Sequence, residues 1–445
     1  MNKMISKLFW NIFTLWHARH EATLPFWSSD RLEELQSRRV RSIVAHAYAT
    51  VPFYREEMDR AGLHPRDFHT ADDLTKLPFI TGNDLAEAPE RFLSRKYSGS
   101  RSLSLYSSGT TGRAKYVCHD PAALFLMMAY GHRQRIVLAH FLGKKFGYRE
   151  MVVAPHQSVG FQLRDFYHSH SWIPRGVDFK RGTLPIDLRI EDSIRELNSF
   201  KPDLLRGNGS YIGVMFRQAH ERSLAVHRPK AILYGGTPIA EYDRTLIETE
   251  FGVPVISSYQ ATEALRIAYQ CERKEGFHIN MDHTAVRVVD ARGEPVGPGG
   301  RGEIIISNLV NRATVLLNYK LGDTVTLGRK RCLCGRSLPI IERLEGRSGS
   351  IFRLTGDRFV HGVILMEELQ AIRGVAQLQI IQEDFRKFLI RVVCSAGAEW
   401  PMIGERVHEI ALSQLGVDIT LEIVPVDCIP FEPGGKIRPI ISPYS

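Results

Sequence analysis

The chain has 445 residues, of which 44% are apolar and 24% charged, the composition of an ordinary globular protein of one to three domains. Its 36 glycines and 22 prolines exclude collagen-like and low-complexity classes, and six cysteines are too few for a disulfide scaffold. The 58 Lys and Arg exceed the 49 Asp and Glu, and the net charge of +9 permits anionic partners. Because no basic run with interleaved aromatic residues occurs, we expect no nucleic-acid partner, and the low cysteine content favours a reduced, cytoplasmic setting.

Residues 1–20 form an apolar and basic leader without any acidic residue. Its cations are Lys3, Lys7 and Arg19, and its apolar residues at helical spacing are Ile5, Leu8, Phe9, Ile12 and Trp16. The pattern predicts an amphipathic leader helix within residues 1–25. Its apolar face either packs on its own domain or makes peripheral contact with a membrane surface. The apolar block is too short for a signal peptide or a membrane-spanning helix.

The rest of the chain predicts helices that alternate with short apolar strands. Residues 28–60 are expected to be helical, with an interruption at Pro52. Residues 285–326 predict antiparallel hairpins with turns at 293–302. Strands are predicted at 151–155, 202–207, 230–236 and 253–259, and helices at 192–200 and 241–251. This alternation is typical of an α/β fold with parallel strand pairing.

A domain boundary is predicted near residues 346–350, where two glycines alternate with serines. Beyond it the pattern predicts strands at 376–384, 387–395 and 418–426 and a helix at 407–416. We therefore expect a large N-terminal domain at residues 1–346 and a small α+β domain with its own core at residues 347–445.

The string from Leu105 to Lys115 has the composition of an anion-binding loop. Four hydroxyl residues and two glycines occupy residues 107–112, and Arg113 and Lys115 follow. Glycine lets main-chain N–H groups approach an anion, hydroxyls donate further hydrogen bonds, and the two cations add positive charge. The string does not match the Walker A pattern. It indicates either a phosphate-binding loop or a solvated Ser/Gly loop.

Five further strings follow in a fixed order: Tyr234–Pro238, Tyr259–Glu263, Tyr319–Asp323, Gly346–Arg347 and Pro433–Arg438. With the Ser/Gly string, they resemble the adenylate-forming (ANL) superfamily, and most closely its phenylacetate–CoA ligase branch with the CapK-like members of capsule biosynthesis. Residues 46–81 and 332–339 resemble the same branch. The resemblance implies a large domain with mixed sheets and flanking helices that binds ATP and the acid. It also implies a small mobile domain that carries the adenylation lysine.

The resemblance further implies that a carboxylate attacks the α-phosphorus of ATP and that the resulting acyl-adenylate passes its acyl group to coenzyme A. Lys436 would bridge the carboxylate and the α-phosphate, Glu263 would bind Mg²⁺, and Asp323 would accept hydrogen bonds from the ribose hydroxyls. Gly235 and Gly236 would lie by the adenine. The full set of expected nucleotide-binding residues is Ser107, Ser108, Gly109, Thr110, Thr111, Gly112, Lys115, Gly235, Gly236, Tyr259, Thr262, Asp323 and Arg347.

Three parts of the sequence depart from the family pattern. Ser348, Gly349 and Ser350 follow the hinge arginine where relatives often place an acid, although Gly349 itself can absorb a hinge rotation. Gln260 stands where many relatives have glycine, and Thr237 stands where they carry Glu or Ala. The acid pocket, which residues 156–161 would help to line, therefore cannot be copied from relatives.

Three cysteines and a histidine have the spacing of a metal site. Cys271 precedes His278 by seven positions, and Cys332 and Cys334 form a Cys-x-Cys pair. This set matches a structural zinc site of the Cys₃His type, which some members of the branch carry at similar residues. The alternative is three buried reduced cysteines and a surface histidine. The remaining Cys118, Cys394 and Cys428 lack partners at ligand spacing.

The leading functional hypothesis is an ATP-dependent enzyme that activates an aryl or related carboxylic acid and transfers it to coenzyme A, with ATP, Mg²⁺ and a structural Zn²⁺ bound. A first alternative keeps adenylation but changes the acceptor to an amine, a hydroxyl or a carrier-protein thiol, or transfers AMP itself. A second alternative is a nucleotide-binding scaffold that has lost catalysis. The oligomeric state is not predicted.

Overall fold

The computed structural model describes residues 3–97, 102–108, 114–155, 158–172, 180–186, 188–347, 351–356, 358–394, 397–427, 429 and 438–443. The chain forms two compact units. The first unit comprises residues 1–147, 159–179 and 257–344, and the second comprises residues 148–158, 180–256 and 345–445. Each unit therefore assembles segments that lie far apart in the sequence.

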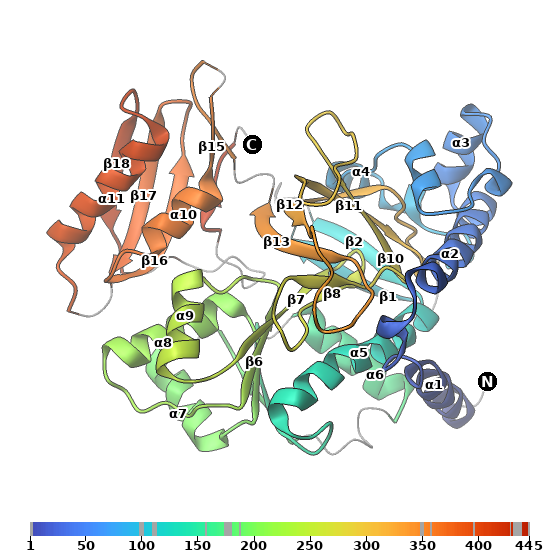
Figure 1. Cartoon of the computed structure of the whole chain (residues 1–445), viewed down its shortest axis with the longest axis horizontal. Helices are drawn as coiled ribbons and strands as arrows, with labels where there is room; N and C mark the ends of the chain where they lie inside the picture. Colours follow the sequence, from blue (N-terminus) through green and yellow to red (C-terminus); the bar gives the residue numbers. More distant parts are fainter. Residues whose placement is uncertain are drawn as a thin grey trace. The chain divides into compact units, whose positions relative to one another are not determined.

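The first unit contains the helices that precede residue 171. Pro52 begins a new helix after α2, because proline is tolerated in the first turn of a helix but not inside one. The Asp120 carboxylate starts α5 by accepting a hydrogen bond from the N–H of Ala123 (3.0 Å), and Gly143 ends it at φ +72°. Figure 1 shows α1 beside α5 and α6, against which it packs. The helices are α1 (Lys3–Ala18), α2 (Ser29–Thr50), α3 (Pro52–Arg60), α4 (Gly82–Glu87), α5 (Pro121–Leu142) and α6 (Val159–His170), with short 3₁₀ turns η1 (Leu24–Phe26), η2 (Pro65–Asp67), η3 (Asp72–Lys76) and η4 (Pro89–Phe92).

The strands of the first unit form a two-stranded pair and a larger, mostly antiparallel arrangement. β1 (Leu103–Ser108) pairs antiparallel with β2 (Ala114–His119). The other strands follow the order β10-β11-β12-β13-β9-β8-β7. Their bounds are β7 (Val255–Ala261), β8 (Leu265–Tyr269), β9 (Phe277–Ile279), β10 (Thr284–Val289), β11 (Arg301–Asn308), β12 (Tyr319–Leu327) and β13 (Ile340–Arg347). The main core of this unit includes the fully buried Tyr54 and Tyr319.

The second unit contains a parallel sheet in the order β6-β5-β3-β4. The sequence reads as apolar runs here because strands covered by helices are buried. The strands are β3 (Arg149–Val153), β4 (Lys180–Leu184), β5 (Leu204–Gly207) and β6 (Ala231–Gly235), and the helices are α7 (Ile190–Phe200), α8 (Gly209–Glu221) and α9 (Glu241–Glu250). One apolar cluster connects these strands and helices.

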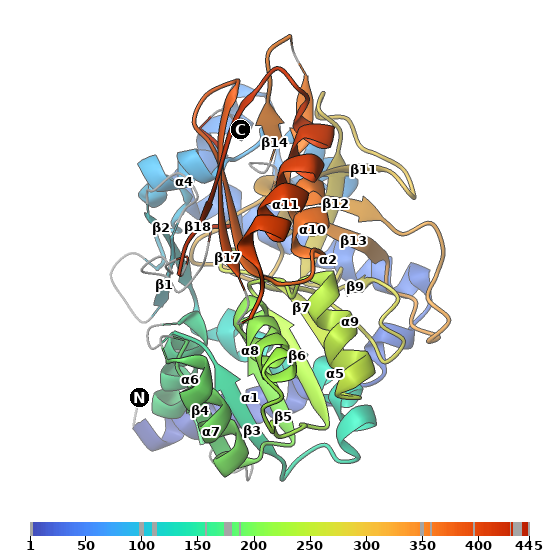
Figure 2. The ribbon, with the colours of Figure 1, turned by 90° about the vertical axis from the view of Figure 1, so that its left-hand side faces the viewer.

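The residues after 350 build a separate small sheet with the order β18-β17-β16-β19. Figure 2 shows α10 and α11 side by side next to this sheet, and their apolar side chains share one cluster with it. The elements are β14 (Ile351–Arg353), β15 (Phe359–His361), α10 (Gly362–Gln370), β16 (Val375–Gln382), β17 (Lys387–Cys394), α11 (Trp400–Leu415), β18 (Thr420–Pro425) and β19 (Ile440–Ile441).

These elements confirm the predicted α/β fold. Residues 28–60 form α2 and α3, the predicted hairpin segment forms β10, β11 and β12, and the apolar runs between 149 and 235 form parallel strands. The four elements expected after residue 375 correspond to β16, β17, α11 and β18. The boundary at residues 346–347 and the mobility of the small domain stay predictions. Among the described residues, no helix has the combined length and apolar character needed to cross a membrane.

Candidate nucleotide and metal sites

The Ser/Gly string lies between two paired strands. β1 ends at Ser108 and β2 begins at Ala114, and these two residues are register partners. The chain therefore enters and leaves the string at adjacent points, as expected of a loop that wraps an anion. Gly109, Thr110, Thr111 and Gly112, and the side chains of Ser107 and Ser108, lie outside the described residues, so their phosphate-binding roles stay predictions.

A chain of hydrogen bonds joins a lysine, a tyrosine and a glutamate from three separate strings. The Lys115 ammonium donates to the Tyr319 hydroxyl (3.4 Å), and that hydroxyl donates to Oε1 of Glu263 (3.1 Å). The main-chain carbonyl of Glu263 also accepts a hydrogen bond from the Asn308 side-chain amide (3.1 Å). Both the main chain and the carboxylate of this buried glutamate are thus held in place. A carboxylate positioned in this way suits a hard cation such as Mg²⁺.

A second contact joins the same two segments of the chain. The Tyr259 hydroxyl donates to Oδ2 of Asp323 (2.5 Å). Tyr259 lies four residues before Glu263, and Asp323 lies four residues after Tyr319. Two hydrogen bonds therefore connect residues 259–263 with residues 319–323, which the sequence had singled out as separate motifs. The contact orients the Asp323 carboxylate, whose oxygens are hydrogen-bond acceptors for hydroxyl groups.

His119 holds the main chain of the motif at residues 259–263. Its Nε2 lies 2.8 Å from the carbonyl oxygen of Thr262, and because a carbonyl can only accept, this nitrogen carries the proton. The ring is buried, and burial lowers the pKa of His119 to about 4. A neutral imidazole therefore fixes the backbone at Thr262 at neutral pH.

The shifted pKa of His119 predicts a loss of stability in acid. The folded pKa lies below the unfolded value of 6.5, so the stabilisation is complete above pH 6.5 and declines as the pH falls toward about 4. The free energy of unfolding falls by about 3 kcal/mol at most over this range. Urea unfolding at about pH 4 and at pH 6.5 measures the change in the free energy of unfolding. This change should be smaller for His119→Gln than for the wild type, because the glutamine amide can donate the same hydrogen bond but does not titrate. An equal pH dependence in both proteins would contradict this account.

The predicted adenine-binding glycines lie in the second unit, at the carboxyl end of β6. Gly235 is the last residue of the strand, and Gly236 adopts φ +82°, in the left-handed region that favours glycine. After this turn the chain packs closely on the start of α8, because a Cβ on Gly209 would lie 2.4 Å from the carbonyl oxygen of Thr237. Ligands of open parallel sheets bind at the carboxyl ends of the strands, which is where this turn lies.

The hinge and the adenylation lysine are the least described parts of the predicted site. Arg347 ends β13, but its side chain lies outside the described residues, as do residues 348–350 and Lys436. The roles of Arg347 and Lys436 therefore stay predictions from the resemblance.

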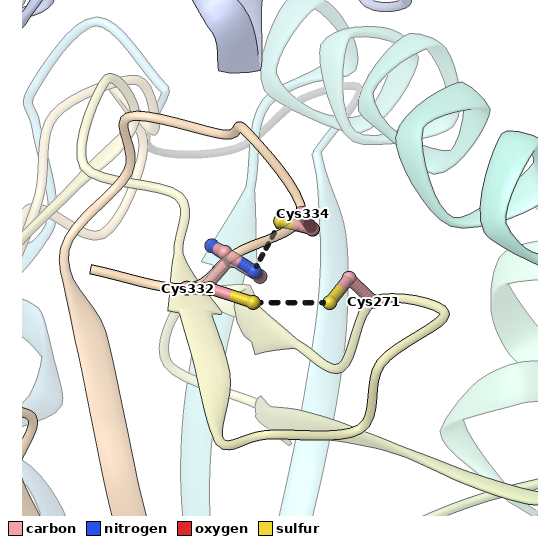
Figure 3. A group of neighbouring side chains, drawn as sticks. Cys271, Cys332 and Cys334 are labelled. Atoms are coloured by element: carbon pink, nitrogen blue, oxygen red, sulfur yellow. Dashed lines mark hydrogen bonds between the residues drawn. The ribbon is translucent and has the colours of Figure 1, made fainter. Parts of the chain in front are cut away.

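The four predicted metal ligands converge at one point in the first unit, and Figure 3 shows the three cysteine sulfurs facing a common space. The Sγ atoms of Cys271 and Cys332 are 3.7 Å apart, and Sγ of Cys334 is 3.4 Å from Nε2 of His278. A tetrahedral zinc ion requires edges of about 3.8 Å between two sulfurs and about 3.5 Å between a sulfur and a nitrogen. All four ligand atoms lie within 4.8 Å of one another. The residues therefore fit a Cys₃His zinc site.

A buried cationic side chain lies against the cluster. Three thiolates, one neutral imidazole and Zn²⁺ sum to a net charge of −1. The buried guanidinium of Arg336 interacts with Cys334 and also pairs with the Glu272 carboxylate (2.8 Å). His278 is fully buried in β9, which excludes the alternative of a surface histidine. Gly335 allows the chain to turn after Cys334 at φ +84°.

Three residues of the site were not predicted from the sequence. Tyr319 was seen only as the start of a string, although its hydroxyl links Lys115 to Glu263. His119 belongs to no recognised string and Arg336 was seen only as part of the string at residues 332–339, and their roles depend on contacts with residues 143 and 64 positions away. The sequence offered no signal for His119, because its burial and its contact with Thr262 exist only in the folded chain.

Residues 33–311 match the family described as AMP-binding enzyme, and residues 355–443 match the CapK C-terminal domain. The chain is 23% identical to a phenylacetate-coenzyme A ligase of Thermus thermophilus, with 94% of this chain and 97% of that protein covered. It is also 23% identical to Protein CapK of Staphylococcus aureus, with 92% and 88% covered. A 2-hydroxyisobutyryl-CoA ligase structure in complex with R3-HIB-AMP shares the fold, with a TM-score of 0.73 at 18% identity and coverage of 95% of this chain and 91% of that chain.

The match to the AMP-binding enzyme family spans more than half of the chain, and it includes the Ser/Gly string and residues 259–263. The chain belongs to the family of AMP-binding enzymes, the adenylate-forming superfamily, as an acyl-CoA-ligase-like enzyme of the phenylacetate–CoA ligase and CapK branch.

Proposed function

We propose that the chain activates an aryl or related carboxylic acid with ATP and transfers the acyl group to coenzyme A. The observation that carries this proposal is the pair of hydrogen bonds between residues 259–263 and 319–323. Two motifs that are about 60 residues apart meet side chain to side chain, and they bring together a carboxylate suited to Mg²⁺ and a carboxylate suited to ribose hydroxyls.

In the first step, an oxygen of the acid attacks the α-phosphorus of ATP and pyrophosphate leaves. This step requires neutralised charge on the phosphates and an in-line arrangement of the attacking and leaving oxygens. Lys115 and the hydroxyls of Ser107, Ser108, Thr110 and Thr111 would hold the phosphates, and Glu263 would hold Mg²⁺. Lys436 would neutralise charge between the acid and the α-phosphate. In the second step, the coenzyme A thiol attacks the acyl carbon and AMP leaves.

The names of the relatives support the transfer of an acyl group to coenzyme A. Both the phenylacetate-coenzyme A ligase of Thermus thermophilus and the 2-hydroxyisobutyryl-CoA ligase are named for joining an acid to coenzyme A. The match to the CapK C-terminal domain and to Protein CapK favours a second candidate. In that candidate the adenylate forms in the same way, but the acceptor is an amine, a hydroxyl or a carrier-protein thiol, or AMP itself is transferred.

Acid-dependent ATP–pyrophosphate exchange tests the first step, and product analysis then tests the second. We expect exchange with members of a panel of aryl, arylacetic and short hydroxy acids, followed by a thioester when coenzyme A is added. Exchange without a thioester would select the second candidate, and no exchange with any acid would refute both. As a site control, Asp323→Ala should raise the KM for ATP by about tenfold or more, because a charge-assisted hydrogen bond to the ribose is lost.

We also propose that Cys271, His278, Cys332 and Cys334 bind one structural Zn²⁺. Zinc would fix the loop between β12 and β13 to β9, since its ligands come from these separate segments. A closed set of four protein ligands leaves no coordination position for substrate, so the ion would supply stability and take no part in the chemistry.

A further inference from the structure

The helix α1 uses only one side to pack on the first unit. The Trp10 ring stacks on Phe125 of α5 at 4.6 Å between centroids, and Phe13 belongs to the same cluster. Asn11 and Thr14 on this side are buried, and their side chains donate hydrogen bonds to the main-chain carbonyls of Lys7 and Trp10. The helix is thus anchored without using the apolar face that the sequence pattern identifies.

That apolar face points to solvent. Seven of the eighteen large apolar side chains that are exposed in the described part of the chain lie on this one helix. They are Met4, Ile5, Leu8, Phe9, Ile12, Leu15 and Trp16, and their spacing places them on one side. The sequence had left open whether these residues pack on their own domain, and their exposure excludes that alternative. Single exposed apolar residues are normal, but a contiguous stripe marks an interaction surface.

The charge around this stripe has one sign. Residues 1–20 contain Lys3, Lys7 and Arg19 and no acidic residue, and the Lys7 ammonium donates to the main-chain carbonyl of His168 on α6 (3.4 Å). The first acid in the sequence, Glu21, is buried and pairs with the buried Arg133 guanidinium at 2.5 Å, so its charge is neutralised away from the helix surface. The Arg19 guanidinium lies 4.5 Å from the Trp16 ring centroid, a combination of aromatic ring and cation that suits a lipid headgroup region.

We propose that α1 docks the enzyme on the surface of a lipid bilayer that contains anionic headgroups. The helix of 16 residues is about 24 Å long and would lie in the plane of the interface, with its apolar stripe among the upper acyl chains and Arg19 at the phosphates. A second copy of the chain is a poorer occupant, because residues 1–20 carry cations and no acid, and a two-fold pair of these segments would bring like charges together. The helix precedes the residues matched by the AMP-binding family, so this inference goes beyond the proposed catalytic function.

Vesicle flotation of the full-length protein tests the proposal. We expect the wild type to float with vesicles of equimolar phosphatidylcholine and phosphatidylglycerol, at least about fivefold more than with phosphatidylcholine alone at low salt. Ile12→Glu/Leu15→Glu, at residues that are 59% and 62% exposed, should reduce the bound fraction by about tenfold or more. Met402→Glu/Val417→Glu is the matched control, since these small-domain residues are 69% and 83% exposed, and it should bind like the wild type.

A second measurement needs no charged substitution. Lipids with brominated acyl chains should quench part of the tryptophan fluorescence of the wild type, and Trp16→Phe should lose that part while it still floats. The proposal is overturned by wild-type protein that fails to float with the anionic vesicles, or by equal binding of Ile12→Glu/Leu15→Glu. It is also overturned if light scattering shows a dimer that this variant dissociates, because the stripe would then be a contact between copies.

Discussion

Replacing Lys436 with alanine should lower acid-dependent ATP–pyrophosphate exchange by about 10³-fold and change the affinity for ATP by less than about threefold. The reason is that, in the proposed mechanism, the Lys436 ammonium would lie between the attacking carboxylate and the α-phosphate and would stabilise charge that develops mainly in the transition state. Removing one such group typically lowers kcat far more than it weakens ground-state binding. Exchange rates and ATP binding by calorimetry would measure the two effects separately.

The control for Lys436→Ala is a lysine of the small sheet with no proposed role. Lys387 on β17 is exposed and pairs with Glu383 at 2.7 Å, so Lys387→Ala should leave exchange unchanged. If Lys436 acts only in adenylation, the variant should still form thioester when a synthetic acyl-adenylate is supplied with coenzyme A. Normal exchange by Lys436→Ala would refute the proposed mechanism.

Loss of the proposed zinc should destabilise the first unit by about 4 kcal/mol or more. Zinc would bind the folded arrangement of Cys271, His278, Cys332 and Cys334 far more tightly than the unfolded chain, so its binding free energy would add to the free energy of unfolding. The purified protein should contain one zinc per chain by elemental analysis, and Cys332→Ser should lose it and unfold at a lower temperature. A strong chelator should have the same effect on the wild type.

Cys118→Ser is the matched control for the zinc site. Cys118 lies on β2 in the same unit, and its thiol contacts the Ser104 hydroxyl at 3.2 Å, so a serine fits there. This variant should keep its zinc and its stability. Wild-type protein that is free of metal and yet as stable as a zinc-loaded sample would contradict the proposal.

Much of the fold could be predicted from short-range patterns. Strand and helix periodicities identified β16, β17, α11 and β18 and the hairpins of residues 284–327, because each pattern depends on residues within one element. The cluster of Cys271, His278, Cys332 and Cys334 was also predicted correctly. The Cys-x-Cys spacing limits how these ligands can be arranged. The types and spacing of the four residues were therefore enough to predict that they lie together.

The contacts of the nucleotide site were harder to predict. The hydrogen bond from Tyr259 to Asp323 spans 64 positions, and that from Tyr319 to Glu263 spans 56. Such pairs depend on how strands that are distant in the sequence pair with one another. A shift of one residue in the pairing register would turn each of these side chains to the opposite face of the sheet. His119 became part of the site only because β2 brings its ring to the carbonyl of Thr262.

The leader helix shows most clearly which features follow from the sequence alone and which depend on the tertiary structure. The sequence by itself determined that a helix with an apolar stripe and a cationic charge lies within residues 1–25, because periodicity and composition are local properties. Only the tertiary structure decided that Trp10 and Phe13 anchor the helix while Ile12 and Leu15 remain exposed. The physical reason is that both sides of this helix carry apolar residues, and the side that is buried depends on the surface that α5 and α6 offer to it.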